Sequence, residues 1–258
     1  MTHDIQAGLD AGIMTLRFNR PTKKNAITRA MYTALAEGLE RADTDNSVRV
    51  VVIAGAPGVF TAGNDLIDFM EAPPHIGGGD APPVERFMRA LMACRKPVIA
   101  AVDGLAIGIG VTLLLHCDLA YASDRSVFRT PFVDLALVPE FGSSVLLPGL
   151  AGRVVANELL MLGESWDAQR AAAKGLVNAV HAPDDLEREV MARAQILAAK
   201  APEALRQTKA LMTAGQDALM AVIRTEGEVF ARQLSSAEFS EAVNAFLERR
   251  APDFSKTG

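Results

Sequence analysis

The sequence runs Val102-Asp103-Gly104-Leu105-Ala106-Ile107-Gly108-Ile109-Gly110-Val111-Thr112 where an apolar strand ends in glycines and a helix begins. The first N–H groups of a helix have no acceptor within the helix, and the helix dipole makes that end positive. The stretch therefore predicts a place that can stabilise an oxyanion. The structural alternative is close helix–sheet packing that only glycine allows. A dinucleotide site is not indicated, because the GxGxxG spacing is missing.

Around this stretch, short apolar or β-branched runs alternate with segments of helical periodicity. The pattern predicts strands at residues 13–18, 48–54, 97–102 and 118–123, and helices at residues 28–42, 84–95 and 108–116. Such alternation is typical of a mostly parallel sheet with helices on its faces. Residues 71–83 are rich in Pro and Gly and predict an irregular loop.

From residue 153 onward the pattern is helical, apart from a short apolar piece at 176–180. It predicts helices at residues 167–174, 184–200, 202–213, 217–232 and 236–249. We expect two parts, an α/β core at 1–195 and a C-terminal helical region at 196–258. The second part carries many apolar residues for its length, so we expect some of them to face a partner subunit.

Composition excludes several classes of function. The chain has 258 residues, half of them hydrophobic, and a net charge of -5, which argues against a nucleic-acid or membrane-surface partner. The N-terminus lacks a basic targeting segment, so we expect a cytoplasmic protein. Cys94 and Cys117 lie in separate apolar segments and are interpreted as buried thiols. The four histidines show no ligand spacing, so no metal site is predicted, and His116 is interpreted as a core residue.

Two further segments can carry chemistry. Phe60-Thr61-Ala62-Gly63-Asn64-Asp65-Leu66 is a turn of small residues whose backbone N–H groups can approach a ligand closely, although an ordinary tight turn has the same pattern. The run Leu137-Val138-Pro139-Glu140-Phe141-Gly142-Ser143-Ser144 sets one carboxylate among apolar neighbours. Such surroundings raise the pKa of a carboxyl group toward the range useful for proton transfer. The alternative is a surface residue in the first turn of a helix.

Together the three segments resemble the enoyl-CoA hydratase/isomerase (crotonase) superfamily over residues 5 to 256. Two other blocks strengthen the resemblance, namely Asn19-Arg20-Pro21 with Asn25-Ala26, and the run from Lys96-Pro97 to Asp103-Gly104. The resemblance implies a crotonase-like (ClpP/crotonase) α/β fold, a spiral of ββα turns with a C-terminal helical trimerisation region. It also implies a homotrimer or a pair of trimers.

The resemblance also implies a catalytic arrangement. In that family two backbone N–H groups hold the thioester carbonyl, and they map to Ala62 and Ile109. Hydratases of the family use two glutamates, which would fall at Thr112 and Phe132, and neither is an acid here. The chain is more similar to the peroxisomal-type Δ3,Δ2-enoyl-CoA isomerases, whose single glutamate falls at Glu140.

Further site residues follow from the same resemblance. The substrate pocket is expected to include Thr112, Phe132, Leu137 and Phe141. Coenzyme A, as part of an acyl-CoA thioester substrate, is expected to contact Lys24, Ala26, Ala62, Asn64, Asp65 and Leu66, with Phe254 and Lys256 closing the site. The 71–83 loop is expected to border the acyl tunnel.

The resulting hypothesis is an isomerase that moves the double bond of a 3-enoyl-CoA to the 2-trans position in fatty-acid β-oxidation, without a metal or redox cofactor. Three alternatives stay open. They are a hydratase-like lyase or other crotonase activity, an acyl-CoA dehalogenase, and a non-catalytic acyl-CoA-binding protein. The dehalogenases carry a histidine on the helix matching residues 84–95, and this chain has none there.

Overall fold

The computed structural model describes residues 3–72 and 81–257, without the side chain of Lys256. In this part of the chain the larger sheet has six strands, β1 (Ile5–Asp10), β2 (Ile13–Phe18), β3 (Val50–Ala54), β5 (Val98–Val102), β7 (Leu119–Ser123) and β10 (Ala179–His181). The smaller sheet consists of β4 (Val59–Thr61), β6 (Leu105–Ile107), β8 (Val127–Arg129) and β9 (Trp166–Asp167).

The topology of both sheets is mostly parallel. The larger sheet has the order β1-β2-β3-β5-β7-β10, with β1 antiparallel to β2 and the other neighbours parallel. The smaller sheet has the order β4-β6-β8-β9, with β9 antiparallel to β8. After β3, β5 and β7 the next strand belongs each time to the smaller sheet. The chain therefore winds in turns of a long strand, a short strand and a helix, which confirms the predicted spiral of ββα turns.

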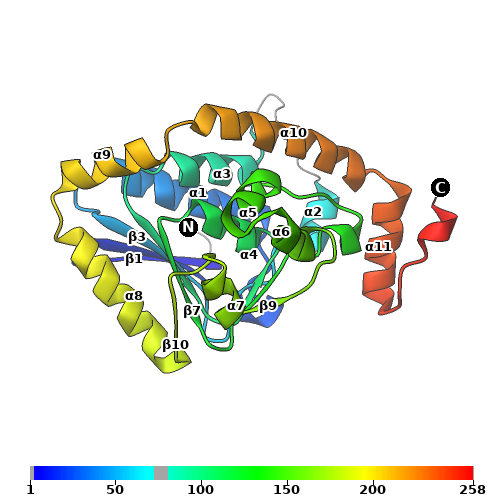
Figure 1. Ribbon diagram of the computed structural model, residues 1–258, viewed down its shortest axis with the longest axis horizontal. Helices are drawn as coiled ribbons and strands as arrows, with labels where there is room; N and C mark the ends of the chain where they lie inside the picture. Colours follow the sequence, from blue (N-terminus) through cyan, green and yellow to red (C-terminus); the bar gives the residue numbers. More distant parts are fainter. Residues whose placement is uncertain (1–2, 73–80, 258) are drawn as a thin grey trace.

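Helices surround both sheets (Figure 1). The α-helices are α1 (Arg29–Thr44), α2 (Leu66–Glu71), α3 (Pro83–Ala93), α4 (Ile109–Thr112), α5 (Ser143–Ala151), α6 (Arg153–Leu160), α7 (Ala168–Ala173), α8 (Pro183–Ala198), α9 (Pro202–Met212), α10 (Gln216–Leu234) and α11 (Ala237–Glu248). Short 3₁₀ helices are η1 (Pro21–Lys23), η2 (Leu113–His116), η3 (Val133–Leu135) and η4 (Phe254–Lys256). In Figure 1, α9 and α10 arch over α1 and α3, and α11 leads to the C-terminus at one end of the molecule.

The core lies on both faces of the larger sheet. All five residues of β3 are buried, and successive side chains of a strand point to opposite faces. Val51 and Ile53 accordingly join the main cluster with residues of α1 and α3. Val50 and Val52 join a second cluster with Leu186 of α8. The β-branched run is therefore covered by helices on both sides, as expected for a buried parallel strand.

Most of the long elements confirm the sequence prediction, as does the short helix α7 predicted at residues 167–174, whereas β1, α2, α5 and α6 were not predicted. Strand β2 has the predicted bounds, and α1, α3 and α8 to α11 lie within a few residues of theirs. The predicted helix at 108–116 is a four-residue α-helix followed by a 3₁₀ turn. The smaller sheet was not predicted, because strands of two or three residues are too short to show a period. Residues 73–80 of the predicted loop lie outside the described residues.

Candidate active site

Two of the motif segments lie side by side. Strand β4 pairs in parallel with β6, with Thr61 opposite Ala106. A methyl group on Gly63 would stand 2.8 Å from the carbonyl oxygen of Ile107, and one on Gly110 would stand 2.6 Å from Cγ2 of Thr61. Both contacts are too short for a real side chain, so glycine is needed at both positions. The structure therefore confirms close packing here and also brings the two loops together.

The backbone N–H groups of these loops that lack an acceptor among the described residues include those of Ile109 and Asn64. Ile109 is the first residue of α4, where an N–H has no intrahelical partner, and Gly108 before it offers no side-chain cap. The second group belongs to Asn64, whose neighbour Gly63 packs against the Ile107 carbonyl. By contrast, the N–H of Ala62 donates to the carbonyl of Lys24 over 2.9 Å. The sequence-based assignment of Ala62 as a ligand donor thus needs correction, because that N–H is already bonded.

Glu140 is held against the same helix. Its side chain is buried, with 6% exposed, and accepts a 2.5 Å hydrogen bond from the hydroxyl of Thr112. Thr112 lies three residues after Ile109, so the two share one face of the helical turn. The carboxyl group therefore lies about one helical turn from the free N–H of Ile109.

Burial sets the protonation of Glu140. Desolvation raises the pKa of its carboxyl group from 4.5 to about 8, the hydrogen bond from Thr112 opposes this, and the charge of Glu226 adds to it. The tyrosine hydroxyl of Tyr32 also has a raised pKa, through burial first and the nearby Glu140 second. An acid that titrates near neutral pH can both accept and return a proton. The surface alternative for Glu140 is therefore wrong.

The turn after Glu140 has an unusual backbone. Phe141 and Gly142 have φ angles of +56° and +76°. For a bulky residue such as Phe this left-handed conformation is uncommon and costs energy. His116 stacks on the Phe141 ring with centroids 3.7 Å apart, and its Nε2 lies 2.7 Å from the Phe141 carbonyl oxygen. Burial lowers the pKa of His116 to about 4, so the neutral ring donates this hydrogen bond.

Other side chains expected to contact coenzyme A have structural partners. The side-chain oxygen of Asn64 accepts from the hydroxyl of Tyr32 over 2.5 Å. Asp65 caps α2 and pairs with Arg20 over 2.6 Å. Lys24 is exposed, and the structure gives its side chain no partner among the described residues.

The remaining predicted residues divide into pocket walls and a distant segment. Phe132, Leu137 and Phe141 are buried in the main cluster, together with Ile109. Ala26 and Leu66 are half-buried beside the loops described above. Phe254 belongs to η4 after α11, and its contact with a substrate stays a prediction. The side chain of Lys256 lies outside the described residues.

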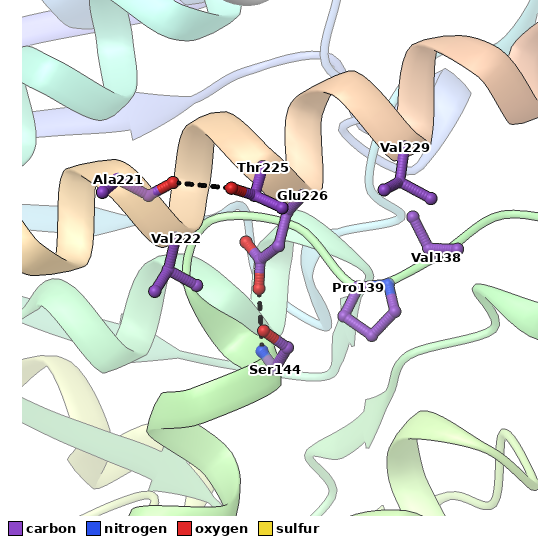
Figure 2. Close-up of a pocket in the computed structure, with 8 residues that line it drawn as sticks. All are labelled: Val138, Pro139, Ser144, Ala221, Val222, Thr225, Glu226 and Val229. Atoms are coloured by element: carbon purple, nitrogen blue, oxygen red, sulfur yellow. Dashed lines mark hydrogen bonds between the residues drawn. The ribbon is translucent and has the colours of Figure 1, made fainter.

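A groove of about 440 Å³ borders the turn that contains Glu140 (Figure 2). Its lining includes Val138 and Pro139 of the turn and Val222, Glu226 and Val229 of α10. Sequence reasoning missed Glu226, which is a buried acid on the predicted 217–232 helix. The available signal was weak, because helical periodicity does not tell a buried acid from a solvated one.

Two features are absent from the described residues. No helix there is long and apolar enough to cross a membrane. No group of three or more His, Cys, Asp or Glu side chains there is arranged to hold a metal ion.

The fold and the site together define a crotonase-like α/β protein. Residues 8–257 match the family model described as enoyl-CoA hydratase/isomerase, and the chain belongs to that family. The chain is 34% identical to the peroxisomal enoyl-CoA delta isomerase 3 of Mus musculus, over 96% of this chain and 79% of that protein. It is 37% identical to the human enoyl-CoA delta isomerase 2, over 93% of this chain and 62% of that longer protein.

Relatives with other activities and solved structures match as well. The 2,3-dehydroadipyl-CoA hydratase of Escherichia coli is 35% identical, over 94% of each chain. The structure of OdaA from Pseudomonas aeruginosa superposes with a TM-score of 0.93 at 45% identity, covering 96% of this chain and all of that one. The family thus combines isomerases and hydratases that act on acyl-CoA thioesters.

Proposed function

We propose that this protein is a Δ3,Δ2-enoyl-CoA isomerase that uses Glu140 as its single catalytic acid–base group. The observation that carries the proposal is the position of one buried carboxyl, with its pKa raised to about 8, beside α4 and its free N–H at Ile109. Fatty-acid β-oxidation is the pathway in which such a reaction is used. We further propose a trimeric assembly and a cytoplasmic location.

The reaction needs one proton to leave C2 of the acyl chain and one to arrive at C4. The carboxylate of Glu140 accepts the C2 proton, and the electrons of that C–H bond form a dienolate with the charge on the thioester oxygen. Glu140, now neutral, returns the proton to C4, so that the double bond lies between C2 and C3. Atoms and charge balance without any other reactant.

We propose that the N–H groups of Ile109 and Asn64 bind the thioester oxygen. Both lack an acceptor in the described part of the chain, and the close packing of Gly63 on Ile107 brings their loops together. The start of α4 adds the positive end of its first peptide dipoles. Removing one such donor in other enzymes costs about 2.7–4 kcal/mol of barrier lowering.

Hydration is the main alternative, since a relative of this chain is named a hydratase. Adding water requires one group to activate the water and another to deliver a proton. Thr112 has only a hydroxyl, which donates to Glu140, and Phe132 has no titratable group. Both oxygens of the nearby Glu226 accept backbone hydrogen bonds. These observations favour the isomerase over the hydratase.

The proposal is tested by giving the purified protein 3-hexenoyl-CoA and, in a separate reaction, 2-hexenoyl-CoA. We expect conjugation of the first, followed by its absorbance, and no hydration of the second. Hydration of 2-hexenoyl-CoA without conjugation of 3-hexenoyl-CoA would overturn it.

A Glu140→Gln variant then tests the base directly. Because Gln cannot take up the C2 proton, kcat should fall about 10²–10⁴-fold. Acyl-CoA binding, measured by calorimetry, should persist because the pocket keeps its shape. An unchanged kcat would remove Glu140 from the mechanism and leave the non-catalytic binding protein or another base to be considered.

A further inference from the structure

The side chain of Glu226, on α10, contacts the turn that contains Glu140. One carboxylate oxygen accepts a 2.6 Å hydrogen bond from the N–H of Gly142, 84 residues away in the sequence. The other oxygen accepts a 3.0 Å hydrogen bond from the N–H of Ser144. Figure 2 shows the side chain pointing from α10 toward Ser144.

The turn lacks local support of this kind. Helix α5 begins at Ser143, and its N-cap residue Gly142 has no side chain to accept the free N–H groups of the first turn. Phe141 and Gly142 are both left-handed, and an unfavourable residue of this type costs about 1–3 kcal/mol. Glu226 therefore supplies from another helix the cap that α5 does not carry itself.

The burial of Glu226 is hard to explain by stability alone. Only 8% of the residue is exposed, and no Lys or Arg forms an ion pair with it among the described residues. Its surroundings in the groove are mainly the apolar side chains of Val138, Pro139, Val222 and Val229. A buried carboxylate is costly unless its oxygens are hydrogen-bonded, and here both hydrogen bonds go to the Glu140 turn.

We infer that Glu226 is a positioning residue for the proton transfer, because its carboxylate fixes the Glu140–Ser144 turn and so aims Glu140 at the substrate. The carbonyl of Glu140 is tied into the same turn by the N–H of Ser143 at 3.1 Å and its hydroxyl at 2.7 Å. Loss of the Glu226 contacts would therefore loosen the backbone of the Glu140 turn, which would keep its bonds with Ser143 and the His116 hydrogen bond to the Phe141 carbonyl. The inference rests on the proposed isomerase function for its kinetic consequences.

Glu226 also acts on the charge of Glu140. Glu140 is faced by Tyr32 of α1, Thr112 of α4 and Glu226 of α10, and His116 of η2 packs on the adjoining Phe141. The charge of Glu226 raises the pKa of Glu140, so its removal lowers that pKa. This shift reports the charge of Glu226, whereas a fall in kcat reports the position of the Glu140 turn.

The test compares Glu226→Gln with Glu228→Gln in the full-length protein. Glu228 is exposed on the same helix, which makes the second variant a matched control. For Glu226→Gln we expect kcat for 3-hexenoyl-CoA to fall about 10- to 100-fold at a pH high enough to ionise Glu140 fully. KM should change less than about twofold. The rise of kcat/KM with pH should move to lower pH. The Glu228→Gln control should match the unmodified protein in both kcat and the pH dependence of kcat/KM.

A Glu226→Asp variant separates the effect of side-chain length from the effect of charge. Aspartate keeps the negative charge but is one methylene shorter, so we expect kcat to fall while the pH profile stays closer to that of the unmodified protein. It also serves as the second variant should Glu226→Gln not fold. An unchanged kcat in both variants, or a change in KM alone, would overturn the positioning role.

An activity-free measurement keeps the inference apart from the proposed function. The side-chain carboxyl of Glu140 is titrated by NMR in protein labelled with ¹³C at glutamate, with Glu140→Gln assigning the signal. Glu226→Gln should lower the titration midpoint of Glu140, whatever the reaction. If the unmodified protein does not isomerise 3-hexenoyl-CoA, the proposed function fails, and an unchanged midpoint would overturn the inference itself.

Discussion

At the scale of single residues, the proposed function depends on one carboxyl group that burial stabilises in its neutral form. Glu140 has its pKa raised to about 8 by burial, with a smaller opposing effect from the Thr112 hydrogen bond. The proposed isomerisation would start from the ionised form, because the carboxylate would accept the C2 proton. We therefore expect kcat/KM to rise with pH through about pH 8.

The hydrogen bond from Thr112 can be removed without changing the size of the side chain. This bond favours the ionised form of Glu140, so a Thr112→Val variant should raise the pKa of Glu140. The rise of kcat/KM should then move to higher pH, opposite to the shift expected for Glu226→Gln. A pH–rate profile of the variant checks this, and a shift to lower pH would contradict the assignment.

The raised pKa of Glu140 also makes a prediction for stability. Below pH 4.5 the group is protonated in both folded and unfolded chains, so it has no effect. As the pH rises from 4.5 to about 8, the unfolded chain loses its proton and the folded one keeps it, so stability falls. The penalty amounts to about 1.4 kcal/mol per unit of pKa difference and is complete above the folded pKa.

A Glu140→Gln variant should therefore be more stable than the unmodified protein at pH 9 and close to it at pH 4.5. Denaturant unfolding at the two pH values measures the difference. A variant that is equally or less stable at pH 9 would show that the carboxyl group is not desolvated as described.

At the scale of elements, the site depends on how closely β4 and its loop approach β6 and α4. Gly63 has a φ of +84°, and a methyl group there would meet the Ile107 carbonyl oxygen at 2.8 Å. The same glycine precedes Asn64, whose N–H we propose as an oxyanion donor. The packing of two short elements therefore decides whether two donors can face one oxygen.

A Gly63→Ala variant should lose about 1–3 kcal/mol of stability, because it combines an unfavourable φ with a backbone clash. We expect kcat to fall as well, since the Asn64 N–H would move away from that of Ile109. Thermal unfolding and steady-state kinetics measure the two effects. Gly149→Ala is the control, because this glycine in α5 has open space around it and should tolerate alanine.

The sequence predicted the long elements because each carries its own signal. The β-branched run of β3 and the Thr28 cap of α1 are local features, and both elements form as expected. Strand β1, helices α2, α5 and α6 and the smaller sheet were missed. Each of β4, β6 and β8 follows a strand of the larger sheet in the chain, and they pair with one another only when successive turns of the fold pack together.

At the scale of the whole molecule, the C-terminal helices do more than cover the core. Helix α10 supplies Glu226 to the Glu140 turn, so the region predicted for assembly also contacts the candidate site. Beyond it, α11 exposes Phe246 and Leu247, with 62% and 59% of these residues accessible. Exposed apolar side chains of this size favour a protein partner.

The proposed trimer is tested by light scattering on a sizing column. We expect a mass of three or six chains for the unmodified protein. Phe246→Glu should reduce the mass if α11 faces another subunit, because the interface would then bury an unpaired charge. A Glu238→Gln variant at an exposed position of the same helix is the control. A monomeric unmodified protein would contradict the prediction.

The amino-acid sequence alone predicted the α/β class, the three candidate functional segments and Glu140 as the candidate acid, because residue type and periodicity are local properties and motifs can be compared with a family. Only the tertiary structure decided that the Ala62 N–H is bonded to Lys24, that the Asn64 N–H has no acceptor in the described part of the chain, and that Glu226 caps the Glu140 turn. The physical reason is that the partner of each hydrogen-bonding group depends on which chain segments the fold brings into contact. Contacts between segments that are far apart in the sequence leave no pattern in the residues between those segments.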